Sequence, residues 1–260
     1  DSGAYRADLT RRVAIRTESQ MLADRGAEMA AYFAEMRATL EPMGYVCADY
    51  DNPVDGGGPF LIATRYEATD LPTVLTYGHG DVVRGLEEQW REGLDPWTVT
   101  VEDVDGAAAR WYGRGTADNK GQHSINIGGL RAVLETRGGR LGFNSIILIE
   151  MGEEIGSAGL QAFAESMADK LRADVLIASD GPRLSPERPT LFMGSRGAFN
   201  FNLDLDLRVG AHHSGNWGGL ISNPGVILAN AIACLVDGNG RIKVDALRPQ
   251  SLTNSVRMAL

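Results

Sequence analysis

The stretch that decides the fold runs from residue 144 to residue 157 and reads NSIILIEMGEEIGS. Residues Asn144 to Glu150 contain a continuous apolar run, which is typical of a β-strand covered on both faces. Two adjacent carboxylates, Glu153 and Glu154, follow this strand directly. Open α/β sheets bind their ligands at this position, beyond the carboxyl ends of the strands. A solvated acidic turn is the ordinary alternative, which the apolar strand and the flanking glycines disfavour.

Strands and helices alternate on both sides of this stretch. Further strands are expected at residues 59–64, 73–77 and 174–178, and helices at about 120–134 and through 160–167. This order and spacing predict an α/β fold, with a mostly parallel sheet flanked by helices.

An amphipathic helix is expected at residues 21–43. Its apolar residues step by four, three, four and three positions and therefore share one face: Met29, Phe33, Met36, Leu40 and Met43. Gly44 supplies the left-handed residue that ends many helices. We interpret the methionines as core residues rather than as a metal-binding cluster.

The pattern changes near Met193 to Gly197, where we place a domain boundary. Residues 199–207 alternate strictly between apolar and polar side chains, which predicts a strand with one solvated face. Residues 224–236 look helical. The sequence therefore predicts an α/β domain at residues 1–193 and a smaller α+β domain at residues 194–260.

The composition excludes several classes of protein. The 260 residues are 43% hydrophobic and carry a net charge of −9, which argues against nucleic-acid binding. No apolar run approaches the roughly 20 residues of a membrane helix, and the first residues lack a basic-then-apolar signal peptide, so a cytoplasmic protein is expected. Cys47 and Cys234 stand in apolar settings and are expected to be small buried residues.

Three further polar motifs stand at expected strand ends or helix starts, and each has an ordinary explanation when taken alone. His79 and Asp81 follow the strand at 73–77 and suit a metal-ligating imidazole with a carboxylate behind it, or a loop histidine. Asp118 lies in the glycine-rich segment 113–121 and suits a metal ligand or a helix cap. This segment lacks the spacing of a phosphate-binding loop. Asp180 lies in Ser-Asp-Gly-Pro, an ordinary turn signal.

Together the four motifs converge at one edge of the predicted sheet and supply one imidazole and several carboxylates. This mixed set suits zinc, or less specifically cobalt or manganese. Two divalent ions would bring four positive charges, which Asp118, Glu154, Asp180 and a bridging hydroxide would balance. The sequence therefore predicts a site for two divalent metal ions.

The four ordered motifs resemble those of the M20 family of metallopeptidases, from about Tyr5 to beyond Ala233. This family includes carnosinase-like dipeptidases, acetylornithine deacetylase and succinyl-diaminopimelate desuccinylase. The resemblance implies a zinc-dependent hydrolase that cleaves an amide bond through a metal-bridged hydroxide. Asp180 and the Asp-Asn-Lys-Gly motif resemble the dipeptidase branch, so dipeptides or short peptides are the expected substrates. N-acyl or N-carbamoyl amino acids are one alternative, and a non-catalytic metal-binding or oligomerisation protein is another.

The resemblance also implies a role for each motif residue. The metal ligands would be His79, Asp118, Glu154 and Asp180, with Asp118 between both ions. Glu153 would be the general base, and its free carboxylate argues against a purely structural site. Asp81 would orient the imidazole of His79. A cis peptide often follows the bridging aspartate, here between Asp118 and Asn119.

Residues 194–260 would, by the same resemblance, begin a lid that is inserted into the catalytic domain and commonly forms a homodimer. His213, in the motif at residues 213–219, would stabilise the oxyanion, in dimeric members within the active site of the partner. His212 is interpreted as a solvated loop residue and His123 as a helix residue. Family members have a further metal-binding histidine after the lid. No residue up to Leu260 fills that position, so the second metal is expected to be held poorly.

Overall fold

The computed structural model describes residues 3–106, 108–181, 183–185, 187–192, 197, 200–248, 254 and 258. The chain divides into two compact units, Asp1–Thr190 and Leu191–Leu260. The boundary predicted near Met193 to Gly197 includes four residues, 193–196, that lie outside the described part of the chain. It stays a prediction.

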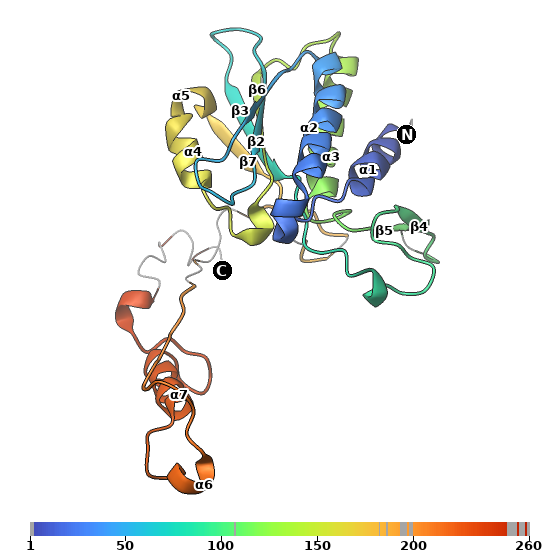
Figure 1. The fold of residues 1–260 in the computed structure, drawn as a ribbon. Helices are drawn as coiled ribbons and strands as arrows, with labels where there is room; N and C mark the ends of the chain where they lie inside the picture. The colour runs from blue at the N-terminus through green and yellow to red at the C-terminus, as the bar shows by residue number, and fades with distance from the viewer. Residues whose placement is uncertain are drawn as a thin grey trace. The chain divides into compact units, whose positions relative to one another are not determined.

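A five-stranded sheet forms the centre of the first unit (Figure 1). Its strands, in spatial order, are β1 (Val46–Tyr50), β2 (Phe60–Arg65), β6 (Asn144–Glu150), β3 (Thr73–His79) and β7 (Val175–Ala178). Strand β3 pairs in parallel with β6 and β7, whereas β2 is antiparallel to β1 and β6. Four of the five strands therefore point the same way, which confirms the predicted α/β fold with a mostly parallel sheet.

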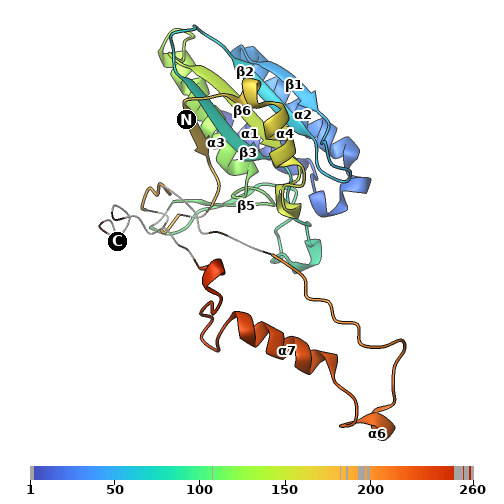
Figure 2. The ribbon, with the colours of Figure 1, turned by 90° about the vertical axis from the view of Figure 1, so that its left-hand side faces the viewer.

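Helices cover both faces of this sheet (Figures 1 and 2). One face carries α1 (Ala4–Ala14), α2 (Gly26–Leu40) and α3 (Lys120–Thr136), and the other carries α4 (Leu160–Ser166) and α5 (Ala168–Leu171). Because successive strand residues point to opposite faces, Ile147 and Ile149 of β6 pack with α2 and α3. Ile146 and Leu148 pack instead with Phe163 of α4. Strand β6 is buried along its whole length, which confirms that it is covered on both faces.

The amphipathic helix has the predicted apolar face but begins later than predicted. All five predicted core residues are buried: Met29, Phe33, Met36, Leu40 and Met43. Gly44 ends the segment with a φ of 82°. Residues Ser19–Asp24 form a separate 3-10 helix, and the α-helix starts only at Gly26. Met21 has non-helical backbone angles, with φ −123° and ψ 33°, and this kink separates the segment from the α-helix that follows.

Short elements complete the first unit. Strands β4 (Thr100–Glu102) and β5 (Arg110–Tyr112) form an antiparallel pair. The remaining short 3-10 helices are Glu41–Met43, Glu87–Gln89 and Glu153–Ile155. The last of these carries the two adjacent glutamates that follow β6.

The second unit contains α6 (Ser214–Trp217), α7 (Pro224–Leu235) and the 3-10 helix Asp245–Leu247. Helix α7 confirms the helix predicted at residues 224–236. The strand predicted at residues 199–207 is wrong for residues 200–207, and residue 199 lies outside the described part of the chain. A strand needs a partner for its backbone groups, and no described segment forms a ladder with residues 200–207.

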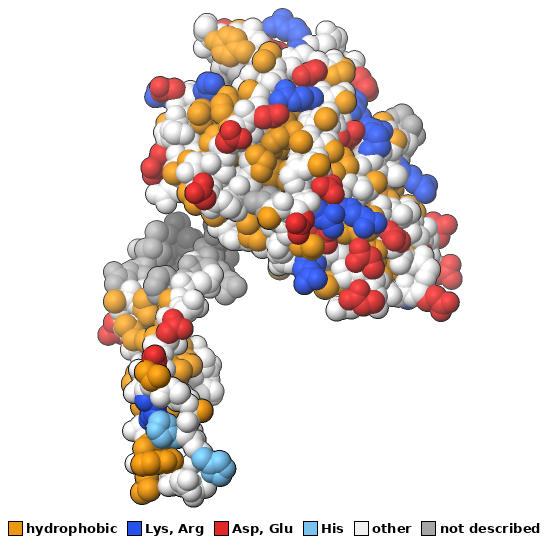
Figure 3. Space-filling view, viewed as in Figure 1, with side chains coloured by type: hydrophobic (Ala, Val, Ile, Leu, Met, Phe, Trp, Pro, Cys, Tyr) orange, Lys and Arg blue, Asp and Glu red, His pale blue; other side chains and the backbone are white. Residues whose placement is uncertain are grey.

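Three further features bear on the sequence-based expectations. None of the helices in the described part of the chain is long and apolar enough to cross a membrane. Acidic and basic side chains are intermixed on the face of the first unit that Figure 3 shows. The cysteines differ from expectation, because Cys47 is only half-buried and Cys234 is exposed on α7.

Candidate metal centre

The predicted site residues of the first unit lie at or just beyond the carboxyl ends of three neighbouring strands, except for Asp118, which lies just before α3. Strand β3 lies between β6 and β7, and the three run in parallel. His79 is the last residue of β3, Glu153 and Glu154 begin the 3-10 helix after β6, and Asp180 follows β7. Parallel strands end at the same edge of a sheet, so residues that are far apart in the sequence meet there.

The imidazole of His79 is fully buried and lies at the centre of this group. Its Nε2 lies 2.9 Å from Asp118 Oδ1, 3.7 Å from Asp180 Oδ2 and 3.8 Å from Glu153 Oε2. Its Nδ1 lies 3.3 Å from Asp81 Oδ1 and 3.1 Å from the backbone oxygen of Asp81. Three carboxylates therefore face one ring nitrogen, and a fourth faces the other.

The buried carboxylate of Asp81 also holds the acidic turn that follows β6. Its Oδ1 accepts the backbone N–H of Glu153 at 3.2 Å, and its Oδ2 accepts that of Glu154 at 3.1 Å. The first N–H groups of a helical turn have no partner within the turn and need an acceptor from elsewhere. Asp81 therefore links the imidazole at the end of β3 to the two glutamates at the end of β6.

Several carboxylates lie at this edge of the sheet, and their charge shifts the pKa values of neighbouring groups. Burial lowers the pKa of His79, but the hydrogen bond and charge of Asp81, with the charges of Glu153 and Asp118, outweigh burial and raise the pKa to about 9. Burial, and then the charge of Asp118, raises the pKa of Glu154 to about 7. Burial also raises the pKa of Glu153, and neighbouring carboxylates add to this rise. Burial and neighbouring negative charge both disfavour an ionised carboxylate, and a bound cation would offset this effect.

Three of the predicted ligands form a group that could hold a metal ion. Donor atoms of His79, Asp118 and Asp180 all lie within 4.8 Å of one another. An imidazole nitrogen with carboxylate oxygens suits zinc, cobalt or manganese, and the shortage of positive charge fits a divalent cation. Among the described residues this group does not include Glu154. A second ion held by Glu154 therefore stays a prediction.

The glycine-rich segment fixes the start of α3 next to this group. Asp118 is joined to Asn119 by a cis peptide bond, as the resemblance implies. The amine of buried Lys120 donates to the carbonyls of Arg12 at 3.0 Å and of Ile15 at 2.7 Å, at the end of α1. Burial lowers the pKa of Lys120 to about 7. Lys120 therefore fastens the first turn of α3 to the end of α1.

The other histidines are not part of the metal-compatible group. His123 lies in α3, as predicted, and is buried. His212 is exposed and meets Trp217 edge-on, with 5.7 Å between ring centroids. His213 belongs to the second unit, where its Nδ1 accepts the backbone N–H of Gly215 at 3.0 Å at the start of α6. The role expected for His213 stays a prediction.

One residue beside the candidate ligands, Asn119, received no role of its own from the sequence motifs. Asn119 is fully buried, and its side chain bonds to the backbone N–H of His79 and to the carbonyl of Ser179. A signal was available in the sequence, because Asn119 directly follows Asp118 at a helix start. A polar side chain that is buried there must find hydrogen-bond partners.

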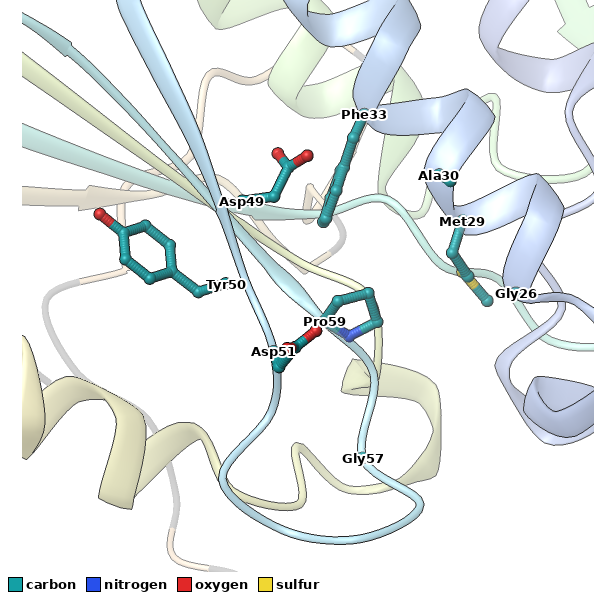
Figure 4. Close-up of a pocket in the computed structure, with 9 residues that line it drawn as sticks. All are labelled: Gly26, Met29, Ala30, Phe33, Asp49, Tyr50, Asp51, Gly57 and Pro59. Atoms are coloured by element: carbon teal, nitrogen blue, oxygen red, sulfur yellow. The ribbon is translucent and has the colours of Figure 1, made fainter.

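A separate hollow of about 400 Å³ lies between α2 and the segment that follows β1 (Figure 4). Met29 and Phe33 of α2 form part of its wall, and Asp49 and Tyr50 of β1 form another part. The carboxylate of Asp49 is paired with Arg37 at 2.6 Å. None of the residues predicted for the metal centre lines this hollow.

Comparison with known proteins gives consistent matches. Residues 75–251 match the profile of peptidase family M20/M25/M40. The chain is 30% identical over 211 residues to the cysteinylglycine-S-conjugate dipeptidase of Corynebacterium striatum, an alignment that covers 81% of this chain and 44% of that protein. It is similar to the crystal structure of human carnosine dipeptidase 1, with a TM-score of 0.68, 27% identity and coverage of 97% of this chain and 54% of that chain. It is also similar to an M20 family metallo-carboxypeptidase from Sulfolobus solfataricus, with a TM-score of 0.73, 26% identity and coverage of 99% and 55%. The chain thus spans about half the length of these proteins.

Proposed function

Because the chain belongs to peptidase family M20/M25/M40, we propose that it is a metal-dependent hydrolase that cleaves the amide bond of dipeptides or short peptides. The observation that carries this proposal is the place of Glu153. Its carboxylate lies 3.8 Å from Nε2 of His79, beside the metal-compatible group but outside it. A structural metal site needs no free carboxylate next to its ligands. The dipeptidases among the similar proteins support the substrate class.

In this proposal, the residues at the sheet edge have two roles, metal binding and proton transfer. Divalent ions, most simply zinc, held by His79, Asp118 and Asp180 with the help of Glu154, would lower the pKa of a water and polarise the substrate carbonyl. Glu153 takes a proton from the attacking water and passes it to the leaving amine. The raised pKa of Glu153 supports this role, because a carboxylate with a higher pKa is a stronger base and takes the proton of the attacking water more readily.

Roles for the two units follow from the same proposal. The first unit carries the chemistry, and the second unit is part of a lid through which two copies pair. The motif at residues 213–219 supports this assignment, with His213 stabilising the oxyanion. Exposed apolar side chains on α7, such as Val226 and Ile232, also support pairing. Sedimentation of the purified protein tests it, and a monomer at all concentrations would contradict the dimer.

A substrate panel tests the reaction. Cysteinylglycine and β-alanylhistidine, which have free amines, are compared with N-acetyl and N-carbamoyl amino acids, each with added zinc or manganese. We expect hydrolysis of the free dipeptides only. Preference for the acylated compounds would favour an amidohydrolase of the deacetylase type. Metal binding without any hydrolysis would favour a non-catalytic metal-binding protein.

The role of Glu153 is tested by Glu153→Gln. Loss of a general base should lower kcat by about 10²- to 10⁴-fold, while the zinc content of the protein stays unchanged. Glu165→Gln is the matched control, because Glu165 lies in α4 and bonds to Gln161 rather than to a site residue. Near-normal kcat in Glu153→Gln would show that the assignment is wrong.

A further inference from the structure

The side chain of Asn119 lies beside all three residues of the metal-compatible group, His79, Asp118 and Asp180. Asn119 directly follows Asp118. Its Oδ1 accepts the backbone N–H of His79 at 3.2 Å. Its Nδ2 donates to the carbonyl of Ser179 at 2.6 Å, and Ser179 directly precedes Asp180. One buried amide therefore connects the start of α3, the end of β3 and the segment after β7.

The orientation of this amide follows from the backbone groups that it meets. A backbone N–H can only donate and a carbonyl can only accept. The oxygen of Asn119 must therefore face His79, and its nitrogen must face Ser179. Gln122 agrees with this orientation, because its Oε1 accepts from Nδ2 of Asn119 at 2.7 Å while its own nitrogen donates to the carbonyl of Gly181 at 3.0 Å.

The orientation of Asn119 fixes the proton on His123. Nδ1 of His123 lies 3.0 Å from Asn119 Oδ1, which only accepts, so Nδ1 carries the hydrogen. Burial, and then the positive charge of Arg12, holds the pKa of His123 well below its usual range. The ring is therefore neutral, and its Nε2 accepts from the hydroxyl of Tyr32 at 2.6 Å. Tyr32, His123 and Asn119 thus form one chain of hydrogen bonds, in which Tyr32 donates to His123 and His123 donates to Asn119.

We propose that Asn119, His123 and Tyr32 are positioning residues, which hold the candidate ligands His79, Asp118 and Asp180 in the arrangement that binds the metal. This inference rests on the proposed function, because it takes these three residues as ligands. The three positioning residues touch no substrate. Their effect is exerted through the Asn119 amide, whose oxygen accepts from both His79 and His123.

Metal affinity of the complete chain tests the network. Zinc is titrated into the metal-free protein against a competing chelator. His123→Leu removes the donor to Asn119 and should weaken zinc binding by about 10- to 100-fold, the usual effect of losing a residue that orients metal ligands. His123→Asn places an amide nitrogen where Nδ1 stood and should recover most of this loss.

Two buried tyrosines provide a matched comparison. Tyr32 and Tyr45 belong to the same hydrophobic core, and each hydroxyl makes a buried hydrogen bond. The bond of Tyr45 goes to Ser145, at 2.8 Å, and not towards the ligands. Tyr32→Phe should weaken zinc binding and shift the visible absorption bands of the cobalt-loaded protein. Tyr45→Phe should change neither, although each variant loses one hydrogen bond.

The outcomes separate this inference from the proposed function. Wild-type zinc affinity and an unchanged cobalt spectrum in both His123→Leu and Tyr32→Phe would overturn the network, even if dipeptides are hydrolysed. Absence of hydrolysis would overturn the proposed function, whatever the affinities. If His123→Leu does not fold, Tyr32→Phe decides. The nitrogen chemical shifts of His123 give a direct readout, and a proton on Nε2 instead of Nδ1 would also overturn the inference.

Discussion

Replacing Asp81 by asparagine should disturb the candidate metal centre through two separate contacts. The carboxylate of Asp81 accepts the backbone N–H groups of Glu153 and Glu154, at 3.2 and 3.1 Å, and faces His79. An asparagine offers one oxygen and one NH2 group, so at least one buried N–H would lose its acceptor. Loss of a hydrogen bond to a charged group costs about 1.5–3 kcal/mol. For a unit of this size, 2 kcal/mol lowers Tm by roughly 4–8 °C.

The second effect of Asp81→Asn is on metal affinity. The variant no longer holds the imidazole of His79 or the turn of Glu154 in place, so zinc binding should weaken by about 10- to 100-fold. Thermal unfolding of the metal-free protein measures the first effect, and zinc titration measures the second. Asp8→Asn is the control, because the carboxylate of Asp8 is bound by Arg11 and Arg131. The reasoning is refuted if Asp81→Asn keeps wild-type zinc affinity, or if Asp8→Asn weakens zinc equally.

Three further predictions concern single positions. In Gly78→Ala the new Cβ would lie 2.8 Å from that of His123, so unfolding should become easier by about 1–3 kcal/mol and zinc should bind less tightly; a wild-type melting curve would contradict this. Phe163→Ala removes a ring stacked on Phe60 at 4.1 Å and should cost about 3–5 kcal/mol in urea unfolding; a loss below about 1 kcal/mol would contradict the packing. Burial raises the pKa of Cys47 to about 11, so its alkylation at pH 8 should be roughly two orders of magnitude slower than that of an ordinary thiol and should accelerate as pH rises towards 11. A rate independent of pH in this range would contradict the raised pKa.

Local patterns in the sequence predict most of the first unit. The apolar run of β6 and the stepped apolar residues of α2 each depend on neighbours within a few positions, so their periods are visible without a structure. The start of α2 was missed because the backbone kinks at Met21, which the apolar pattern does not record. The strand expected at residues 199–207 is not found at residues 200–207, since strand formation depends on a partner as well as on alternation.

Part of the candidate site could likewise be predicted from local sequence patterns, and part depends on contacts between distant segments. Residues such as His79 and Asp180 are visible because each follows a predicted strand, and strand ends of a parallel sheet share an edge. The part played by Asn119 depends on partners from three distant segments. Tyr32, which is the far end of the network, lies on a different helix from His123. Its hydroxyl is indistinguishable in the sequence from that of any other core tyrosine.

The order of strands in the sheet also determines when the candidate metal centre can form during synthesis of the chain. Strands β2 and β3 are consecutive along the chain, yet β6 lies between them. Until residue 150 has been made, the only ladder of this sheet with both strands present is that of β1 with β2. Strand β3 then acquires β6, and later β7, over long separations in sequence whose closure is slow. His79 and Asp118 are synthesised before Asp180. The three side chains can come together only after β3 has paired with β6 and β7.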